Sequence, residues 1–270
     1  AANILGPDRK GKRTILAIYE NALEKHLQSR RYDLIHSTLP ILSADVYQPR
    51  GGSYREAMLQ NIRSYPNPAV RIFKRTFHFL NHRRTEYMKA EENLLRINQK
   101  VIVAALSKYV KEHFAQHYGL ADERIAVICN GVSLPQPPRE DAITALRNKI
   151  LERACLRYNS QAVIFLFAAN NFRLKGLREL ILAQSKAAQI ASTPLVLAVA
   201  GKGKPSSWRN LAWLKGIDSQ IVFLGPLPDM DTALEAADAA VLPTWYDPSS
   251  RFILEALAAG KPVITTTLNG

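Results

Sequence analysis

Cysteine is scarce in this chain, which has only Cys129 and Cys155 among its 270 residues. The two form no Cys-x-x-Cys motif, and both lie in apolar or helical surroundings. We therefore expect two small, buried or half-buried thiols and no disulfide framework. A reducing, cytoplasmic compartment is consistent with this composition.

Long apolar runs are also missing from the sequence. A bilayer-spanning helix needs roughly 20 apolar residues, whereas the strongly apolar segment 195–200 has only the length of a strand. Low-complexity tracts, flexible linkers, repeats and a signal peptide are not found either. The chain opens with Ala1 and not with Met, so we expect that further residues precede it.

Acidic residues are outnumbered, since 36 Lys and Arg stand against 23 Asp and Glu and give a formal net charge of +13. Residues 1–133 hold 21 basic and 12 acidic residues, and residues 134–270 hold 15 and 11. The excess in the first half predicts an anionic partner, such as phosphate, nucleic acid or an anionic lipid surface. A solvated basic face is the alternative.

The second half alternates short, fully apolar segments with amphipathic ones, which is typical of a parallel sheet covered by helices on both faces. The segments expected to be strands are 162–168, 195–200, 221–224, 239–242 and 262–266. The segments expected to be helices are 175–189, 206–215, 230–237 and 251–259.

The first half alternates less regularly. One long basic helix is expected over 70–95, and Ser107 is expected to cap a helix that ends near Tyr118, before Gly119. The segments expected to be strands are 33–37, 101–106 and 124–129.

Segment 132–138 breaks both periodicities, so we divide the chain into domains at 1–133 and 134–270. Both are expected to be Rossmann-like, doubly wound α/β domains that face a cleft. Ligands of such sheets bind outside the carboxyl ends of the strands. Functional side chains are therefore expected directly after strands.

Two turns in the second domain carry chemistry suited to phosphate. Arg173 and Lys175 precede a helix, where free backbone N–H groups attract anions, and the two cations suit a diphosphate. Gly201 and Gly203 follow a strand and would let the backbone approach a ligand closely. Surface charges and a plain turn are the alternatives.

A third turn precedes the helix expected at 251–259. Ser249 and Ser250 beside Arg251 suit a phosphate or a hydroxyl-rich group. Glu255 lies one turn into this otherwise apolar helix, where a carboxylate needs a partner. Sugar or ribose hydroxyls are suitable partners, and a structural ion pair is the alternative.

The stretch 243–266 resembles the donor-site signature of glycosyltransferase family four. That signature is an acidic residue, seven intervening residues and a Glu, followed by a helix end of small residues and Gly-x-Pro-Val. Asp247 and Glu255 have this spacing, and Gly-x-Pro-Val follows at 260–263. The first acid is Asp where Glu is usual.

Other segments support the resemblance. Residues 172–176 are similar to the family's basic diphosphate-binding turn, and 130–132 to the Asn-Gly-Val that ends its first domain. Residues 221–225 resemble the strand before its base-recognition turn. Residues 45–52 are similar to the lipopolysaccharide core glucosyltransferase I subgroup.

The resemblance implies the GT-B fold and a retaining, metal-independent hexosyltransferase that needs no cofactor. Its donor would be a nucleotide-diphosphate sugar, with uridine favoured by analogy. Its acceptor would be a hydroxyl of a glycan or glycolipid in cell-envelope polysaccharide or lipopolysaccharide core synthesis.

The family's first domain normally opens with a strand and a glycine-rich loop, and no segment before Asp33 matches them. Its second normally continues past the last residue here, Gly270, so we expect both domains to be incomplete and the chain to be a fragment.

Roles for individual residues follow from the resemblance. Arg173 and Lys175 would stabilise the departing diphosphate, Asp247 would hold donor-sugar hydroxyls, and Glu255 would hold the ribose hydroxyls. Asp45 is the candidate acceptor-side acid, base or orienting group. Backbone groups of Gly201, Gly203, Ser249 and Ser250 would assist these residues in binding the donor. His36 is a further candidate on the acceptor side.

The basic helix expected at 70–95 interleaves cations with Phe73, Phe77, Phe79 and Tyr87. This pattern indicates contact with a phosphorylated lipid acceptor or an anionic membrane surface, and a core-facing stripe is the alternative. The protein would then be cytoplasmic and peripheral on the inner membrane.

Two other classes of protein stay open. A basic α/β protein could bind nucleic acid, but no recognised nucleic-acid motif occurs, so we expect no such partner. A non-catalytic interaction paralogue is the other class, and it is consistent with Asp at position 247 where the family usually has Glu, and with the expected truncation.

Overall fold

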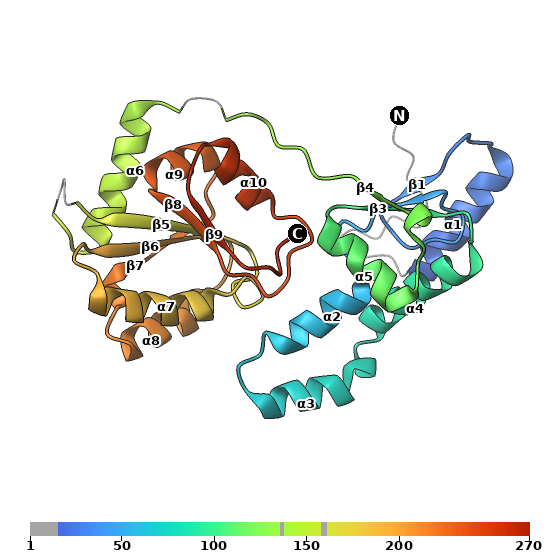
Figure 1. Cartoon of the computed structure of the whole chain (residues 1–270), viewed down its shortest axis with the longest axis horizontal. Helices are drawn as coiled ribbons and strands as arrows, with labels where there is room; N and C mark the ends of the chain where they lie inside the picture. Colours follow the sequence, from blue (N-terminus) through green and yellow to red (C-terminus); the bar gives the residue numbers. More distant parts are fainter. Residues whose placement is uncertain (1–15, 136–137, 158–160) are drawn as a thin grey trace. The chain divides into compact units, whose positions relative to one another are not determined.

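The computed structural model describes residues 16–135, 138–157 and 161–270 (Figure 1). The chain divides into two compact units, the first built mainly from residues 16–129 and the second mainly from residues 130–269. The boundary predicted from the sequence follows residue 133. Its linker, 132–138, includes two residues outside the described part of the chain.

The sheet of the second unit has five parallel strands in the order β7-β6-β5-β8-β9. Each strand forms from one of the predicted segments. An apolar segment of this length can be buried on both faces, as β6 and β8 are, whereas the edge strand β9 has no buried residue. The strands are β5 Val163–Ala168, β6 Leu195–Ala200, β7 Ile221–Gly225, β8 Ala239–Leu242 and β9 Val263–Thr265. The order starts in the middle with β5, runs outward to β7, and then returns to place β8 on the other side of β5. Strands β5 and β8 therefore flank a topological switch point, where ligands bind in sheets of this kind.

Helices cover both faces of this sheet (Figure 1). Two of them, α7 and α8, lie on one face, and α6, α9 and α10 lie on the other. Their bounds are α6 Glu140–Arg153, α7 Leu177–Ile190, α8 Ser206–Leu214, α9 Met230–Ala236 and α10 Arg251–Ala258, with a short 3-10 turn η3 at Asp218–Gln220. The core between the layers is aliphatic, with Ile164, Leu197 and Ile181 fully buried. Each such side chain contributes about 2 kcal/mol by leaving water.

The first unit contains four short parallel strands that follow one another in chain order across their sheet. They are β1 His36–Ser37, β2 Val46–Tyr47, β3 Ile102–Ala105 and β4 Ile125–Val127. Its helices are α1 Leu16–Ser29, α2 Tyr54–Arg63, α3 Pro68–Thr76, α4 His82–Ile97 and α5 Lys108–Tyr118, with 3-10 turns η1 His78–Leu80 and η2 Asp122–Arg124. The predicted caps of α5 are confirmed. The Ser107 hydroxyl accepts from the Val110 N–H at 3.2 Å, and Gly119 ends the helix with φ +61°.

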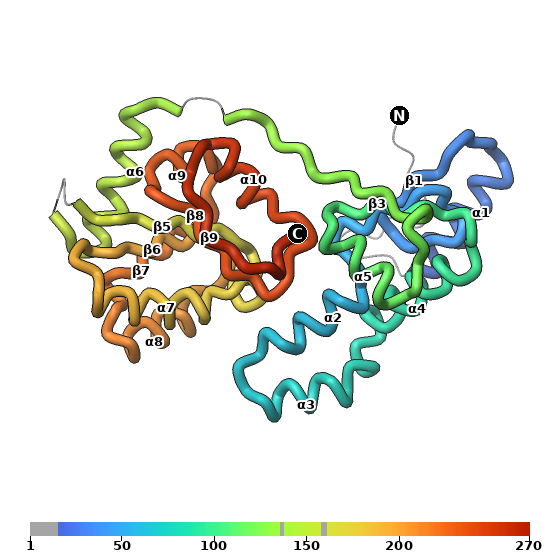
Figure 2. Tube along the Cα trace, viewed as in Figure 1, coloured from blue at the N-terminus to red at the C-terminus, as the bar shows by residue number. Residues whose placement is uncertain are grey.

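The single long helix predicted over 70–95 is wrong. The tube in Figure 2 turns between α3 and α4, and η1 fills the gap. Asn81 is the physical reason, because its side-chain oxygen accepts from the Arg84 N–H at 3.2 Å and caps a new helix. A short amide side chain favours such a cap over a helix interior.

The prediction of buried thiols is also wrong, since Cys129 and Cys155 are both exposed. Cys155 follows α6 in a left-handed conformation with φ +56°, where the chain leaves the helix. Within the described ranges, no helix has both the length and the apolar character needed to cross a membrane.

Candidate functional site

The loops that follow β5 and β8 meet at the switch point of the second sheet. The Trp245 N–H donates to the Leu174 carbonyl at 2.9 Å, and the Thr244 hydroxyl donates to the same oxygen at 3.3 Å. Gly176 makes this approach possible. Its φ is +81°, and a Cβ there would lie 1.9 Å from the Pro243 carbonyl oxygen. A glycine therefore brings together two predicted turns that are far apart in sequence.

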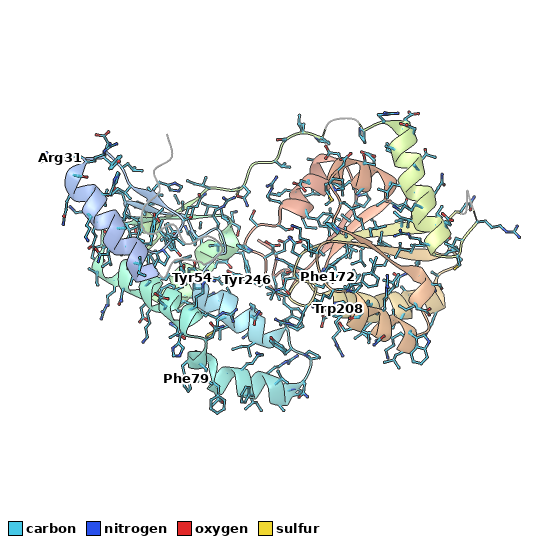
Figure 3. The ribbon with its side chains drawn as sticks, turned by 180° about the vertical axis from the view of Figure 1, so that it is seen from behind. Arg31, Tyr54, Phe79, Phe172, Trp208 and Tyr246 are labelled. Carbon is cyan, nitrogen blue, oxygen red and sulfur yellow. The ribbon has the colours of Figure 1, made fainter. Side chains whose placement is uncertain are left out.

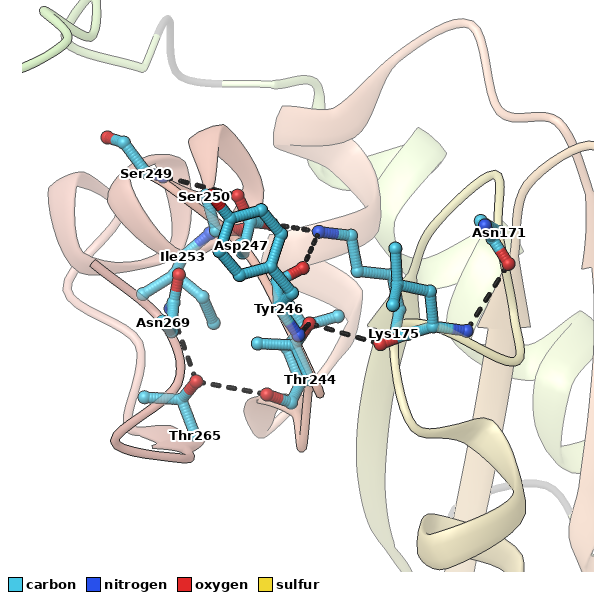
Figure 4. A network of polar contacts seen from close by, with 12 residues as sticks. Asn171, Lys175, Thr244, Tyr246, Asp247, Ser249, Ser250, Ile253, Thr265 and Asn269 are labelled. Atoms are coloured by element: carbon cyan, nitrogen blue, oxygen red, sulfur yellow. Dashed lines mark hydrogen bonds and ion pairs between the residues drawn. The ribbon is translucent and has the colours of Figure 1, made fainter. Parts of the chain in front are cut away.

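An ion pair joins the two loops (Figure 4). Lys175 Nζ donates to Asp247 Oδ2 at 2.6 Å and to the Tyr246 carbonyl at 2.9 Å. The other carboxylate oxygen of Asp247 accepts from the Ser249 N–H at 3.3 Å. These contacts fix the ammonium group at the carboxyl edge of the sheet. Because an ammonium group has three N–H donors, the two contacts leave one donor for a ligand.

The start of α10 lies beside this pair. Ser250 is its N-cap, and its hydroxyl accepts from the Ile253 N–H at 3.4 Å. That oxygen serves the helix, so Ser250 supports the site as a cap. The remaining N–H groups of the first turn carry the partial positive charge of the helix, which favours an anion. Arg173 lies in the β5 loop, two residues before Lys175.

Glu255 lies one turn further along α10 and pairs with Arg251, with 3.3 Å between their closest atoms. The structural ion pair considered for Glu255 is therefore present. The Arg251 side chain is 71% exposed, and an exposed pair of this kind contributes only about 0.5 kcal/mol. Such a weak contact does not prevent Glu255 from accepting hydrogen bonds from ligand hydroxyls.

Gly201 and Gly203 let the loop after β6 pack against the loop after β5. Gly201 has φ +131°, and a Cβ there would lie 1.8 Å from the Ala169 carbonyl oxygen. A Cβ on Gly203 would lie 2.4 Å from the ring of Phe172, which is buried and labelled in Figure 3. Close packing of these loops therefore requires both glycines. This structural requirement holds whether or not their backbone groups also contact a ligand.

A hollow of about 310 Å³ lies at the ends of β5 and β6 and reaches the first turns of α9 and α10. Its walls are mostly apolar, with Asn170 and Lys202 as polar members. Such a lining is typical of a small-molecule site. Several lining residues were not among the sequence candidates. Pro226, Leu227 and Met230 come after the strand at 221–225, and Phe252 lies in the first turn of α10.

The first-unit candidates occupy a different kind of position. Asp45 directly precedes β2, and its carboxylate accepts from the Ile35 N–H at 2.8 Å. His36 is the first residue of β1. Both therefore lie at the amino ends of their strands, whereas ligands of parallel α/β sheets bind at the carboxyl ends. The contact with the Ile35 N–H gives the Asp45 carboxylate a structural role as a cap. The acceptor-side role expected for Asp45 stays a prediction.

The residues that the structure describes include no group of three or more His, Cys, Asp or Glu that could hold a metal ion.

The strand order and switch-point loops define the second unit as a Rossmann-like α/β domain. Comparison with known families then gives two matches, Glycosyltransferase Family 4 over residues 4–136 and Glycosyl transferases group 1 over residues 162–270. The chain belongs to glycosyltransferase family 4 and has the two-domain GT-B fold.

Two relatives illustrate the similarity. The lipopolysaccharide glucosyltransferase WaaG of Escherichia coli strain K12 is 23% identical over 255 residues, which are 94% of this chain and 64% of WaaG. An uncharacterised glycosyltransferase of Methanocaldococcus jannaschii is 28% identical over 171 residues, 62% of this chain and 43% of that protein. The chain thus spans less than two thirds of the length of these relatives.

Solved structures show the same fold. The crystal structure of WaaG matches with a TM-score of 0.65 and 21% identity, covering 94% of this chain and 65% of WaaG. The structure of Anabaena HepE in complex with UDP-glucose matches with a TM-score of 0.62 and 20% identity, covering 92% of this chain and 64% of HepE.

Proposed function

We propose that this chain takes part in a retaining hexosyl transfer from a nucleotide-diphosphate sugar, with uridine as the base, to a hydroxyl of a glycan or glycolipid. The reaction would be metal-independent and cytoplasmic. It would serve cell-envelope polysaccharide or lipopolysaccharide core synthesis. Two observations on relatives support the donor and the setting: HepE has been solved with UDP-glucose, and WaaG is a lipopolysaccharide glucosyltransferase.

One observation carries the donor assignment. The Lys175–Asp247 pair lies at the switch point of the second sheet, beside the start of α10, and the hollow of about 310 Å³ reaches the first turn of the same helix. The Lys175 ammonium group, which Asp247 holds in place, and the helix end supply positive charge for a diphosphate. The hollow has apolar walls for a flat base. Glu255 lies one helical turn from the pair and would accept ribose hydroxyls.

The charges at this site suit the proposed chemistry. When the bond between the sugar and the diphosphate breaks, negative charge grows on the departing diphosphate. Lys175, held in place by Asp247, stabilises that charge in the transition state, and Arg173 adds a second cation. The carboxylate oxygens of Asp247 have further lone pairs, which accept hydrogen bonds from the hydroxyls of the donor sugar and orient them.

Calorimetric titration of the chain with UDP tests this proposal. We expect saturable binding that Lys175→Ala weakens by at least about tenfold, because a charge-assisted contact contributes about 1.5–3 kcal/mol. Lys186→Ala is the matched control, since Lys186 is an exposed lysine on the neighbouring helix α7. No binding at millimolar UDP, or equal losses in both variants, would refute the donor site.

We also propose that α3 and η1 contact an anionic membrane surface. No residue of α3 is buried, and exposed Ile72, Phe73 and Phe79 accompany Lys74 and Arg75. Apolar side chains interleaved with cations suit the interface of an anionic bilayer.

Flotation with lipid vesicles checks the membrane proposal. Anionic vesicles should carry the chain and zwitterionic vesicles should not, and Ile72→Ser with Phe79→Ser should remove most of the bound fraction. Ile190→Ser is the control, because Ile190 is 89% exposed at the end of α7. Equal flotation of the double variant and the control would rule the surface out.

A further inference from the structure

A second hollow, of about 450 Å³, lies in the helical part of the first unit, between α2, α3, η1 and the start of α4. Every residue of its lining belongs to these helices or to the caps that join them. Its volume is within the range of small-molecule pockets, roughly 300–1,000 Å³. The side chains assigned to the donor all belong to the second unit, so this hollow has no role in the proposed donor site.

The walls of the hollow are apolar on two helices. Met58 and Ile62 belong to α2, Phe73 belongs to α3 and Phe77 is the C-cap of α3; all four line the hollow. The two phenylalanine rings have centroids 4.8 Å apart, and the side chains are 58% and 42% exposed. Because residues four apart share one helix face, each of the two helices presents an apolar face to the hollow.

Helix α3 has little packing of its own. It has nine residues and none of them is buried, whereas an isolated helix shorter than roughly 12–15 residues is marginal in water. Its start is supported locally, since the Asn67 side-chain oxygen accepts from the Ala69 N–H at 2.8 Å. An apolar ligand in the hollow would remove the faces of Phe73 and Phe77 from water and so stabilise α3.

Positive charge lies beside these apolar walls. Lys74 of α3 and Arg84 of α4 line the hollow, and none of the described residues in its lining is an Asp or a Glu. The first turn of α4 also borders it, with Asn81 as the N-cap. The N–H groups at the start of a helix carry partial positive charge. Apolar walls beside cations suit a ligand that has an apolar chain and an anionic head.

We propose that this hollow binds an acyl chain of one anionic membrane lipid, with the lipid phosphate against Lys74, Arg84 and the start of α4. The hollow is then a site for a single lipid, in addition to the contact of α3 and η1 with the bilayer surface. A neutral chain would use only the apolar walls, and inorganic phosphate only the cations. The inference rests on the proposed membrane contact for the source of the lipid, but binding of a soluble analogue is measured without a membrane.

Calorimetric titration of the full chain with alkyl phosphates, kept below the concentrations at which they form micelles, tests the inference. We expect the affinity to rise about fourfold for each added methylene group from butyl phosphate onward, and to level off once the chain fills the hollow. Octyl phosphate should bind at least about tenfold more tightly than 1-octanol or inorganic phosphate, because each of these lacks one of the two contacts.

Two variants remove the two contacts separately. Ile62→Trp fills part of the hollow, so the affinity should level off at a shorter chain. Lys74→Gln with Arg84→Gln should weaken the binding of octyl phosphate by at least about tenfold. Arg75→Gln with Lys89→Gln removes the same charge from exposed positions outside the hollow and should leave this binding unchanged.

Three results would overturn the inference: an affinity that rises with chain length without limit, equal affinity for 1-octanol, or unchanged binding in Ile62→Trp. Circular dichroism checks that this variant is folded. If it is not folded, Leu80→Ser replaces it, because Leu80 lines the hollow but is 59% exposed, and it should weaken octyl phosphate. Native mass spectrometry of the chain recovered from phosphatidylglycerol vesicles should show one bound lipid, and a chain without lipid would contradict the membrane source.

The proposals for this chain fail separately. Ile72→Ser with Phe79→Ser changes residues that do not line the hollow, so this variant should lose vesicle flotation and keep octyl phosphate binding; Phe79 is labelled in Figure 3. Lys175→Ala should lose UDP and keep octyl phosphate. Failure of the bilayer contact, of the donor site and of this hollow therefore gives three different results.

Discussion

At the scale of single residues, the candidate site depends on how Asp247 is held. This residue stands where the family signature usually has Glu, and its shorter side chain reaches Lys175 at 2.6 Å and the Ser249 N–H at 3.3 Å. The carboxylate therefore positions the cation that would meet the diphosphate. A spacing of seven residues between the two acids could indicate Asp247 as a site residue, but only the folded loops show which cation it holds.

Glu91 is a second residue whose environment decides its chemistry. It is fully buried on α4, where it accepts from the Tyr118 hydroxyl at 2.6 Å, from the Tyr47 hydroxyl at 2.9 Å and from the Tyr54 N–H that begins α2. Burial raises the pKa of Glu91 to about 7, although the hydrogen bonds from the two tyrosines counteract part of that rise. A buried carboxylate thus joins α2, α4, α5 and β2.

The raised pKa gives a test with a definite sign. Between about pH 4.5 and 7 the folded chain holds a proton on Glu91 that the unfolded chain has lost, so this stabilisation is present at low pH and lost as pH rises through 7. Urea unfolding should therefore show that going from pH 5.5 to 8 costs the wild type about 2 kcal/mol more than it costs Glu91→Gln. Glu92→Gln, on the exposed side of α4, should behave as the wild type. Equal pH dependence in all three proteins would refute the assignment.

At the scale of elements, the sequence predicts the second unit well and the first unit less well. Strands β5 to β8 are apolar runs, and β9 is a short run that ends in Thr265; the pattern identifies all five within about a residue. Strands β1 and β2 have only two residues each, and β2 leaves no recognisable period. The sequence pattern does not reveal the break at Asn81, because a single residue that caps a helix does not interrupt the helical spacing of apolar residues.

The three strand-end turns could likewise be predicted as sites, because the alternation of strands and helices identifies the carboxyl edge. Their mutual contact could not be predicted, since it depends on Gly176 meeting the Pro243 carbonyl. The position of Asp45 relative to β2 could not be predicted for a related reason. Because β2 has no recognisable pattern, the sequence shows only that Asp45 comes after one strand, and the structure shows that it also directly precedes another.

The loop contact predicts the effect of adding one methyl group. Gly176→Ala should force the loops after β5 and β8 apart, separate Lys175 from Asp247, and weaken UDP binding by at least about tenfold together with a loss of stability above about 1 kcal/mol. Gly216→Ala is the matched control, because Gly216 also has a positive φ, +68°, but a Cβ there would meet nothing within 4 Å. The control should lose about 1 kcal/mol of stability and keep its UDP affinity. Unchanged affinity in Gly176→Ala would show that the loop contact does not shape the site.

At the scale of the whole molecule, the chain contains two α/β units with separate chemistry. The second unit brings Lys175 and Asp247 together beside the start of α10, at a sheet whose strand order reverses between β5 and β8. The first unit offers an exposed apolar and basic surface on α3 and a hollow with apolar walls between α2 and α3. Because each unit matches a glycosyltransferase family model, this division fits the proposal of donor binding in one unit and acceptor binding in the other.

The central claim is that the switch point of the second sheet binds a nucleotide diphosphate. A crystal structure of the chain soaked with UDP tests it most directly. We expect a diphosphate oxygen within hydrogen-bond distance of Lys175 Nζ, beside the start of α10, with the base in the hollow lined by Gly201 and Leu227. Density for UDP at any other place, with Lys175 still bound only to Asp247 and the Tyr246 carbonyl, would contradict the account.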